Sequence, residues 1–214
     1  AGPDDQAEGL RFLNPHYFAA GATRWGAEAQ GAYQYADKEY AGFFDHGDGE
    51  AAQCRDCHST HRLEVRVNEC AECHEEMEED GVTVQDIRYN LVDFDGDGDE
   101  EEGLYYEEET MLTDLYAAIQ AYAADTLGTP LAYDSHAYPY FFMDTNANGV
   151  VDPEEAVREN GFAGWTPRLL RAAYNYQWAS KDPGSFAHNG EYILQTLYDS
   201  IEDIGGDVSA MTRP

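Results

Sequence analysis

Two short motifs of the form Cys-x-x-Cys-His limit what this chain can fold into more than any other feature. They are Cys54-Arg55-Asp56-Cys57-His58 and Cys70-Ala71-Glu72-Cys73-His74, and together they contain all four cysteines. Two thiols at this spacing can form thioethers with the vinyl groups on one edge of a porphyrin, while the adjoining imidazole reaches the iron as an axial ligand. The motifs therefore predict two covalently attached haem c groups, with His58 and His74 as proximal ligands.

Other uses of the four cysteines fit this pattern less well. An all-thiolate zinc site would not need a histidine directly after each cysteine pair. A thioredoxin-like redox pair is expected between a strand and a helix, a context that the sequence lacks here. Two disulfides are the usual use of four cysteines in an exported protein, but the spacing indicates haem attachment instead.

Each iron also needs a ligand on its second face, or that face stays open for chemistry. Five further histidines can supply such a ligand, and so can four methionines, although no methionine has positional support. The histidines are His16, His46, His61, His136 and His188. The supply of ligands therefore exceeds the need.

Position along the chain ranks these histidines. His61 lies three residues after His58, which is too close to reach around the same porphyrin, so it would serve the haem held by His74. His16 stands at the head of an alanine-rich helical stretch, residues 14–33, that would lay it over the first haem. We expect distal ligands in the order His61, His16, His46, followed by His188 and His136. The last two are more typical of core or loop histidines.

A twelve-residue segment, 144–155, matches the calcium-binding loop of an EF-hand position by position. Oxygen-bearing side chains stand at positions 1, 3, 5 and 9, a glycine at the tight turn at position 6, and a closing glutamate at position 12. The predicted ligands are Asp144, Asn146, Asn148, the carbonyl of Val150, Asp152 and Glu155. An ordinary turn rich in Asn and Gly would not need a glutamate in that register.

A second acidic segment begins the same pattern, with Asp93, Asp95, Asp97 and Asp99 as candidate calcium ligands. Its twelfth position falls on Leu104, so the closing ligand is missing. The residues that can replace it are Glu101, Glu102 and Glu107. Because so many carboxylates repel one another, we expect calcium to stabilise the fold by binding only the native state. The alternative is a solvated acidic turn.

Three helices are readable in the second half of the chain. Apolar side chains recur at helical spacing in two segments, 112–122 and 194–201, and such stripes face a core. A third helix, rich in Tyr and Trp, is expected over residues 166–181 and ends at Asp182-Pro183-Gly184. In the first half only residues 63–67 alternate like a strand. The acidic runs 75–80, 97–102 and 107–109 are expected to be solvated.

The charge of the chain excludes one class of partner. With 43 acidic and 12 basic residues the formal net charge is −31, which repels nucleic acids and anionic lipid surfaces. Such a charge suits calcium ions, cationic redox partners or a saline environment. No stretch approaches the roughly 18 apolar residues that a membrane span needs. The chain begins with Ala1 rather than Met, as expected after removal of an export signal, although a recombinant start would look the same.

Several segments resemble the large exported multihaem c-type cytochromes of metal-respiring and related bacteria. They are residues 14–23, 31–44, 57–65, 187–192 and 198–203. The resemblance implies that His16, in an Asn-Pro-His-Tyr context, and His61, three residues after a haem motif, are distal ligands. This chain departs from that family in having two haem motifs where its members carry many more.

These observations predict a mainly α-helical protein. Residues 1–82 would form a haem portion with little regular structure, like that of multihaem cytochromes, and residues 83–214 a helical portion with EF-hand-like calcium loops. The two portions would be either separate or joined in one compact unit.

The expected function is electron transfer outside the cytoplasm, in an extracellular or periplasmic location. Two haem c groups and one or two Ca²⁺ ions would be the cofactors, and redox proteins or extracellular electron acceptors the partners. Homo-oligomers or filaments with a continuous chain of haems are expected to form. One alternative is a haem enzyme, such as a peroxidase or an oxyanion reductase, in which one iron stays five-coordinate. Another is a calcium-dependent adhesive or structural subunit.

Overall fold

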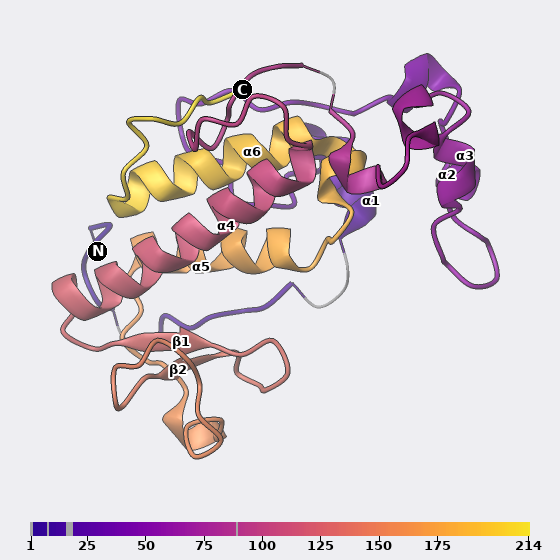
Figure 1. Cartoon of the computed structure of the whole chain (residues 1–214). Coiled ribbons are helices and arrows are strands. Elements are labelled where there is room, and N and C mark those ends of the chain that lie inside the picture. The colour runs from indigo at the N-terminus through magenta and orange to yellow at the C-terminus, as the bar shows by residue number, and fades with distance from the viewer. Residues whose placement is uncertain (1, 8, 16–18, 89) are drawn as a thin grey trace.

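The computed structural model describes residues 2–7, 9–15, 19–88 and 90–214. Figure 1 shows α4, α5 and α6 packed beside one another next to a small β hairpin, while α2 and α3 project from one end of this body. The protein is mainly α-helical, as the sequence predicts. Its elements, with η for 3-10 or π turns, are α1 (Ala20–Ala29), η1 (His46–Gly49), α2 (Cys54–Cys57), α3 (Val67–Cys70), η2 (Glu75–Glu78), η3 (Val84–Asp86), α4 (Leu104–Ala121), η4 (Tyr122–Thr126), β1 (Leu131–Tyr133), β2 (Phe141–Met143), η5 (Arg158–Asn160), α5 (Pro167–Ser180) and α6 (Ser185–Ile204).

The three long helices enclose the hydrophobic core. α4 packs against both α5 and α6, and α5 also packs against α6. Burying an aliphatic side chain stabilises the folded state by about 1.5–3 kcal/mol relative to leaving it exposed. The stripes predicted in residues 112–122 and 194–201 are confirmed as core faces. Fully buried side chains on the three helices include Met111, Leu115, Ile119, Leu169, Ile193, Leu194, Leu197 and Ile201.

The ends of the long helices follow ordinary capping chemistry. α5 begins where the hydroxyl of Thr166 accepts the N–H of Leu169, with Pro167 in the first turn. α6 ends at Gly205, whose φ of 91° lies in the left-handed region that glycine adopts without strain. The helix expected over residues 166–181 is therefore confirmed to within one residue at each end.

The segment from α1 to residue 42 belongs to the same core. α1 packs against α6, and the loop after it is held by Asn175 of α5, which accepts the N–H of Tyr33 at 2.7 Å and donates to its carbonyl at 3.0 Å. Gly26 has a φ of 49°, and a side chain there would meet the carbonyl of Ala41 at 2.2 Å. α1 is shorter than the stretch expected from residues 14–33, because it ends at Gln30 in the left-handed conformation.

The sequence does not predict the β1–β2 hairpin. Its strands are antiparallel and three residues long, with Leu131 opposite Met143, so their alternation is too short to read. Phe141 holds the hairpin against the helices by packing edge-on against Trp165. Residues 63–67, in contrast, form only an isolated bridge between Val65 and His58 rather than a strand.

Two of the three residues in the acidic run 107–109 are buried rather than solvated, contrary to the sequence expectation, whereas Glu109 is exposed. Glu107 and Glu108 lie in the first turns of α4 and face inward, because α4 starts at Leu104, well before its apolar stripe. Burial raises the pKa of Glu108 well above its usual value. The hydrogen bond donated by the hydroxyl of Ser185 lowers this pKa in part, whereas the nearby charge of Asp182 raises it further. Glu108 therefore favours its protonated form in the folded protein.

This burial predicts a pH-dependent loss of stability. The pKa of Glu108 is higher in the folded state than in the unfolded state, so protonation of this side chain stabilises the fold. That stabilisation is complete at pH values below the unfolded-state pKa and is lost as pH rises through the folded-state pKa. Within that window the free energy of unfolding falls by about 1.4 kcal/mol per pH unit at most. We expect Glu108→Gln, which stays neutral, to remove the part of the slope that Glu108 contributes and so to make the profile shallower. Thermal unfolding of both proteins from about pH 5 to about pH 8 measures it, and parallel profiles would contradict the prediction.

Among the residues that the structure describes, no helix has the length and apolar character required to cross a membrane.

Candidate functional site

Both Cys-x-x-Cys-His motifs fold as a single helical turn. In the first, the N–H of His58 donates to the carbonyl of Cys54 at 2.8 Å, and in the second, the N–H of His74 donates to that of Cys70 at 2.9 Å. The turn places each histidine directly after its two thiols. α2 and α3 lie next to each other, because the guanidinium of Arg66 donates to the carbonyls that end α2.

The structure describes all four cysteines, and none of them forms a disulfide. Cys54 and Cys73 are exposed, while Cys57 and Cys70 are half-buried. Burial raises the pKa of the thiols of Cys57 and Cys70, and the nearness of Cys57 adds to the rise at Cys70. The structure therefore brings the second cysteine of one motif close to the first cysteine of the other.

The histidine of the first motif faces a histidine from the far end of the chain. The ring centroids of His58 and His188 lie 6.2 Å apart, with their planes 33° from parallel. Nδ1 of His58 donates to the carbonyl of Leu63 at 3.2 Å, and Nδ1 of His188 donates to the carboxylate of Asp182 at 2.8 and 3.0 Å. Because both partners can only accept, the hydrogen resides on Nδ1 and the lone pair of Nε2 is free.

The histidine of the second motif has an equivalent partner. The ring centroids of His46 and His74 are also 6.2 Å apart, with their planes 78° apart. Nδ1 of His74 donates to the carboxylate of Glu76 at 3.3 Å, and Nδ1 of His46 lies 3.5 Å from the carbonyl of Ala187. These two histidines also keep Nε2 free as a ligand atom.

The spacing of both pairs fits one iron between two imidazoles. A metal–imidazole bond is about 2 Å long and the ring centre lies about 1 Å beyond the nitrogen, so two axial imidazoles have centroids about 6 Å apart. Histidines that bind metals usually donate their other N–H to a carboxylate or a backbone carbonyl, as all four do here. In centroid distance and in the partners of Nδ1, each pair therefore matches two histidines that hold one iron.

A break in α6 places His188. Asn189 is buried and has φ −174° and ψ 75°, which interrupts the helix directly after the histidine. The amide of Asn189 donates to the carbonyl of Gly42 at 2.8 Å, and its oxygen caps the next segment by accepting the N–H of Tyr192 at 3.2 Å. The short first segment of α6 can therefore turn its histidine toward the haem portion while the rest of α6 stays in the core.

The other three candidate histidines do not belong to either described pair. His61 is exposed in the loop between His58 and Val65. His136 is exposed in the turn between β1 and β2. The predicted candidate His16 lies outside the described residues. The available sequence signal for His188 was its position inside residues 187–192, one of the segments that resemble multihaem cytochromes.

The EF-hand-like segment forms a tight loop with its carboxylates turned inward. Asp144 and Glu155 are buried, and the carboxylate of Asp144 accepts the N–H of Asn148 and of Gly149. Glu155 accepts hydrogen bonds from the hydroxyl of Thr145 and from its N–H at 2.6 Å, and these bonds lower the pKa of the Glu155 carboxyl. The loop follows the strand β2 and precedes η5, so it does not lie between two helices.

Comparison with known proteins gives one consistent family. Residues 25–90 match the class III cytochrome c family. The chain is 30% identical to the C-type polyheme cytochrome OmcB of Geobacter sulfurreducens and 31% identical to the C-type polyheme cytochrome OmcC of the same organism, over 230 aligned positions in each case. These alignments cover 91% of this chain but 27% and 26% of the relatives, so the chain spans about a quarter of their length. No solved structure matches it. Both haem-attachment motifs lie inside the family match, and nearly the whole chain aligns with polyhaem proteins, so it belongs to the multihaem c-type cytochromes.

Proposed function

We propose that this protein transfers electrons through two c-type haems that are each bound by two histidines. The observation that carries the proposal is the pairing of His58 with His188 and of His46 with His74 at equal centroid distances of 6.2 Å. The first haem would be held by the thiols of the first motif and the second by those of the second. When bound, haem supplies a one-electron iron couple, and the chain holds the iron, excludes other ligands and tunes its potential.

The two pairs favour an electron carrier over a haem enzyme. An enzyme of the peroxidase type needs one open face on the iron beside an acid–base residue. In the proposed arrangement His188 and His46 occupy those faces, so a substrate has no position from which to bind the iron. A carrier needs only that the edge of each porphyrin approach a partner.

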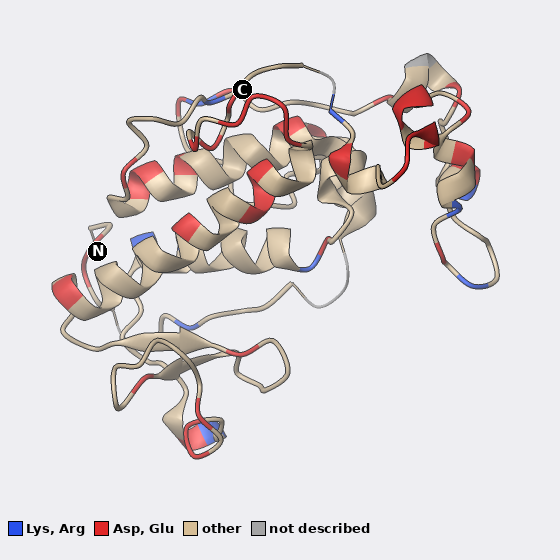
Figure 2. Ribbon diagram, viewed as in Figure 1, with Lys and Arg blue, Asp and Glu red and all other residues tan. Residues whose placement is uncertain are grey.

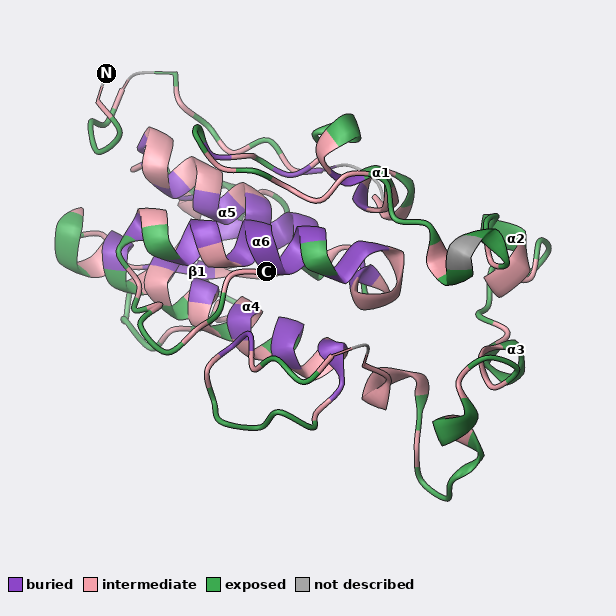
Figure 3. Cartoon of the chain, turned by 90° about the horizontal axis from the view of Figure 1, so that it is seen from above, coloured by how far each residue is buried: buried purple, intermediate pink, exposed green. Residues whose placement is uncertain are grey.

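The surroundings of the motifs support a bound cofactor. Leu63, Val65 and Val67, in the segment between the two motifs, are exposed, and so are Trp25 and Phe43, whose rings pack together at an angle of 48°. Figure 3 shows that α2, α3 and the loops around them consist mainly of exposed and half-buried residues. Apolar groups gathered in this way normally face a partner or ligand, and two porphyrins would cover such groups.

The two haems would exchange electrons through a short path. Ala187, whose carbonyl contacts Nδ1 of His46, directly precedes His188. The distal ligand of the second haem is therefore in contact with the peptide group that carries the distal ligand of the first. Residues 1–82 and 83–214 would accordingly form one unit in which the C-terminal helices complete the N-terminal haem sites.

We place this function outside the cytoplasm, with redox proteins, extracellular acceptors or further copies of the chain as partners. Figure 1 shows the haem motifs projecting from the helical body, where the haem of another molecule can approach them.

Open head-to-tail association of copies would join the haem pairs into a longer chain of haems. Figure 2 shows acidic residues along α4, α6 and several loops, with few basic residues, so cations such as calcium would be needed to bring copies together. The loop 144–155 is proposed as one calcium site.

The visible spectrum of the purified haem-loaded protein tests the proposal. We expect two haems per chain, low-spin in the oxidised and the dithionite-reduced protein, with no shift when carbon monoxide is added to the reduced form. A high-spin fraction that binds carbon monoxide would overturn the histidine pairing and favour the enzyme alternative.

Sedimentation of the same sample in millimolar calcium is expected to show assemblies, and a monomer at every concentration would overturn the association.

A further inference from the structure

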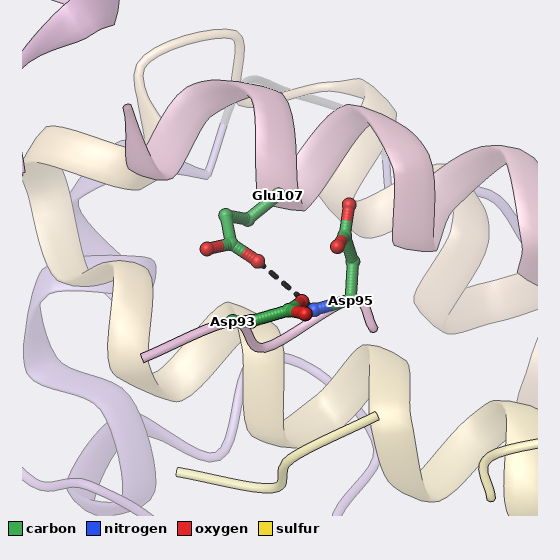
Figure 4. A group of neighbouring side chains, drawn as sticks. All are labelled: Asp93, Asp95 and Glu107. Carbon is green, nitrogen blue, oxygen red and sulfur yellow. Dashed lines mark hydrogen bonds between the residues drawn. The ribbon is translucent and has the colours of Figure 1, made fainter. Parts of the chain in front are cut away.

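A cluster of carboxylates lies where the chain leaves the haem portion and enters α4. Asp93, Asp95 and Glu107 bring carboxylate oxygens within 4.8 Å of one another, and Asp95, Asp97 and Glu102 form a second such group. Figure 4 shows the first group, with Glu107 reaching down from α4 to the loop that carries the two aspartates. Asp95 belongs to both groups and therefore joins the five carboxylates into one continuous cluster.

The cluster contains unpaired, buried oxygen atoms. Asp95 is only 5% exposed, and its Oδ2 has no hydrogen-bond partner among the described residues. Oε1 of Glu102 is likewise buried, and it too lacks a partner within the described part of the chain. A buried carboxylate oxygen without a donor costs free energy unless a cation compensates for it. Such atoms therefore indicate a ligand that is a cation.

The electrostatics of the cluster also call for a cation. Burial, assisted by repulsion from the neighbouring carboxylates, raises the pKa of Asp95 to about 6 and that of Glu102 to about 7. Glu107 is fully buried, and Arg88 reaches it at 3.3 Å. One guanidinium offsets one of five negative charges, so most of the repulsion remains.

The loop has the backbone form that presents oxygen ligands. The carboxylate of Asp93 accepts the N–H groups of Gly96 at 2.6 Å and Gly98 at 3.0 Å, which folds the loop around this side chain. The same stretch is fixed to α4, because Glu107 accepts the N–H groups of Phe94 and Asp95 at 2.8 and 2.9 Å. The backbone thus holds the aspartates and the glutamate in one place.

We infer that this cluster binds one Ca²⁺ through Asp93, Asp95, Asp97, Glu102 and Glu107. Ca²⁺ accepts six to eight oxygen ligands in flexible geometry, whereas Mg²⁺ requires a near-ideal octahedron and retains several waters. Glu107 takes the role of the closing glutamate that Leu104 cannot provide, although it stands three positions later. The site does not depend on the proposed haem ligation.

This assignment changes the ligand set expected from the sequence. Asp99, expected as a ligand, belongs to neither carboxylate group, whereas Asp97 belongs to one, and the carboxylate of Asp99 accepts the N–H of Glu101. Asp99 therefore provides a matched control of the same charge in the same loop. The ion would join the loop to α4, and also to the C-terminal segment, because Thr212 donates its N–H to the carbonyl of Phe94 at 2.9 Å.

Calorimetric titration of the chelator-stripped, haem-loaded protein with CaCl₂ tests the site. We expect Glu107→Gln to lower the number of bound ions by one, or to weaken one site by about tenfold or more. Asp99→Asn is expected to bind as the unchanged protein does, and the loop 144–155 to account for the sites that remain. A Glu107→Gln protein with the full number of ions and unchanged affinity overturns the inference.

A second variant separates loss of the site from loss of the fold. Glu102→Gln lies at the edge of the cluster, is half-buried, and is expected to weaken the same site by about tenfold while leaving helix content unchanged. Unchanged calcium affinity in this variant also overturns the inference. The haem spectrum, recorded on the same samples, reports the histidine pairing separately, so failure of one proposal is distinguishable from failure of the other.

Discussion

Replacing His188 with alanine is expected to convert one of the two haems from low-spin to high-spin and to let it bind carbon monoxide. The reason is that the proposed assignment leaves the iron beside His58 with a single protein ligand once the imidazole 6.2 Å away is gone. Half of the haem absorbance should change, because the second haem keeps His74 and His46. Optical spectra and carbon monoxide titration of the reduced protein measure the effect.

The other histidines provide the controls. His46→Ala should produce the same change in the other haem, and the double variant should convert both. His61→Ala removes an exposed imidazole in the loop after the first motif and should leave the spectrum unchanged. If His61→Ala instead yields a high-spin haem while His188→Ala does not, the pairing is wrong and the spacing argument for His61 is restored.

Replacing Asp182 with asparagine is expected to raise the reduction potential of the same haem. The carboxylate of Asp182 is buried and accepts the Nδ1 hydrogen of His188 at 2.8 Å, which makes that imidazole a stronger electron donor and stabilises the ferric state. Loss of an outer hydrogen-bond partner of this kind changes metal affinity by about tenfold or more. A tenfold loss of affinity for the ferric relative to the ferrous iron raises the reduction potential by about 59 mV. Spectroelectrochemical titration measures both potentials.

Glu76 provides the matched control for Asp182. It accepts the Nδ1 hydrogen of His74 at 3.3 Å, but its side chain is 47% exposed, so water screens its charge. Glu76→Gln should therefore shift the second potential much less than Asp182→Asn shifts the first. Equal shifts in the two variants would mean that burial of Asp182 plays no part in setting the potential.

Features that depend on neighbouring residues could be predicted from the sequence, but contacts between distant parts of the chain could not. The haem motifs could be identified because thiols and imidazole act within one helical turn, as in Cys54 to His58. The apolar stripes of α4 and α6 were readable for the same reason, since helical spacing repeats locally. The sequence ranks His188 below other histidines because its position depends on the break at Asn189 and on the packing of α6, neither of which leaves a pattern near the motifs.

The acidic cluster shows the same limit of local patterns. The loop beginning at Asp93 was recognised as a likeness of an EF-hand, but its twelfth position is Leu104. The structure brings Glu107 into the cluster because α4 begins at Leu104 and its first turn presents the glutamate to the loop. The sequence already offers Glu101, Glu102 and Glu107 as replacements, but spacing alone does not choose among them.

The contact between His58 and His188 also sets an order of events for a newly made chain. His188 lies 130 residues after His58 (188 minus 58), and closing a loop of that length costs about 4 kcal/mol of chain entropy. Thioether formation needs only the five residues of a motif, so it can precede folding, whereas the second imidazole arrives only when α6 docks. On the proposed assignment, an incompletely folded chain carries an attached haem with one open face, and capping of that face marks the end of maturation.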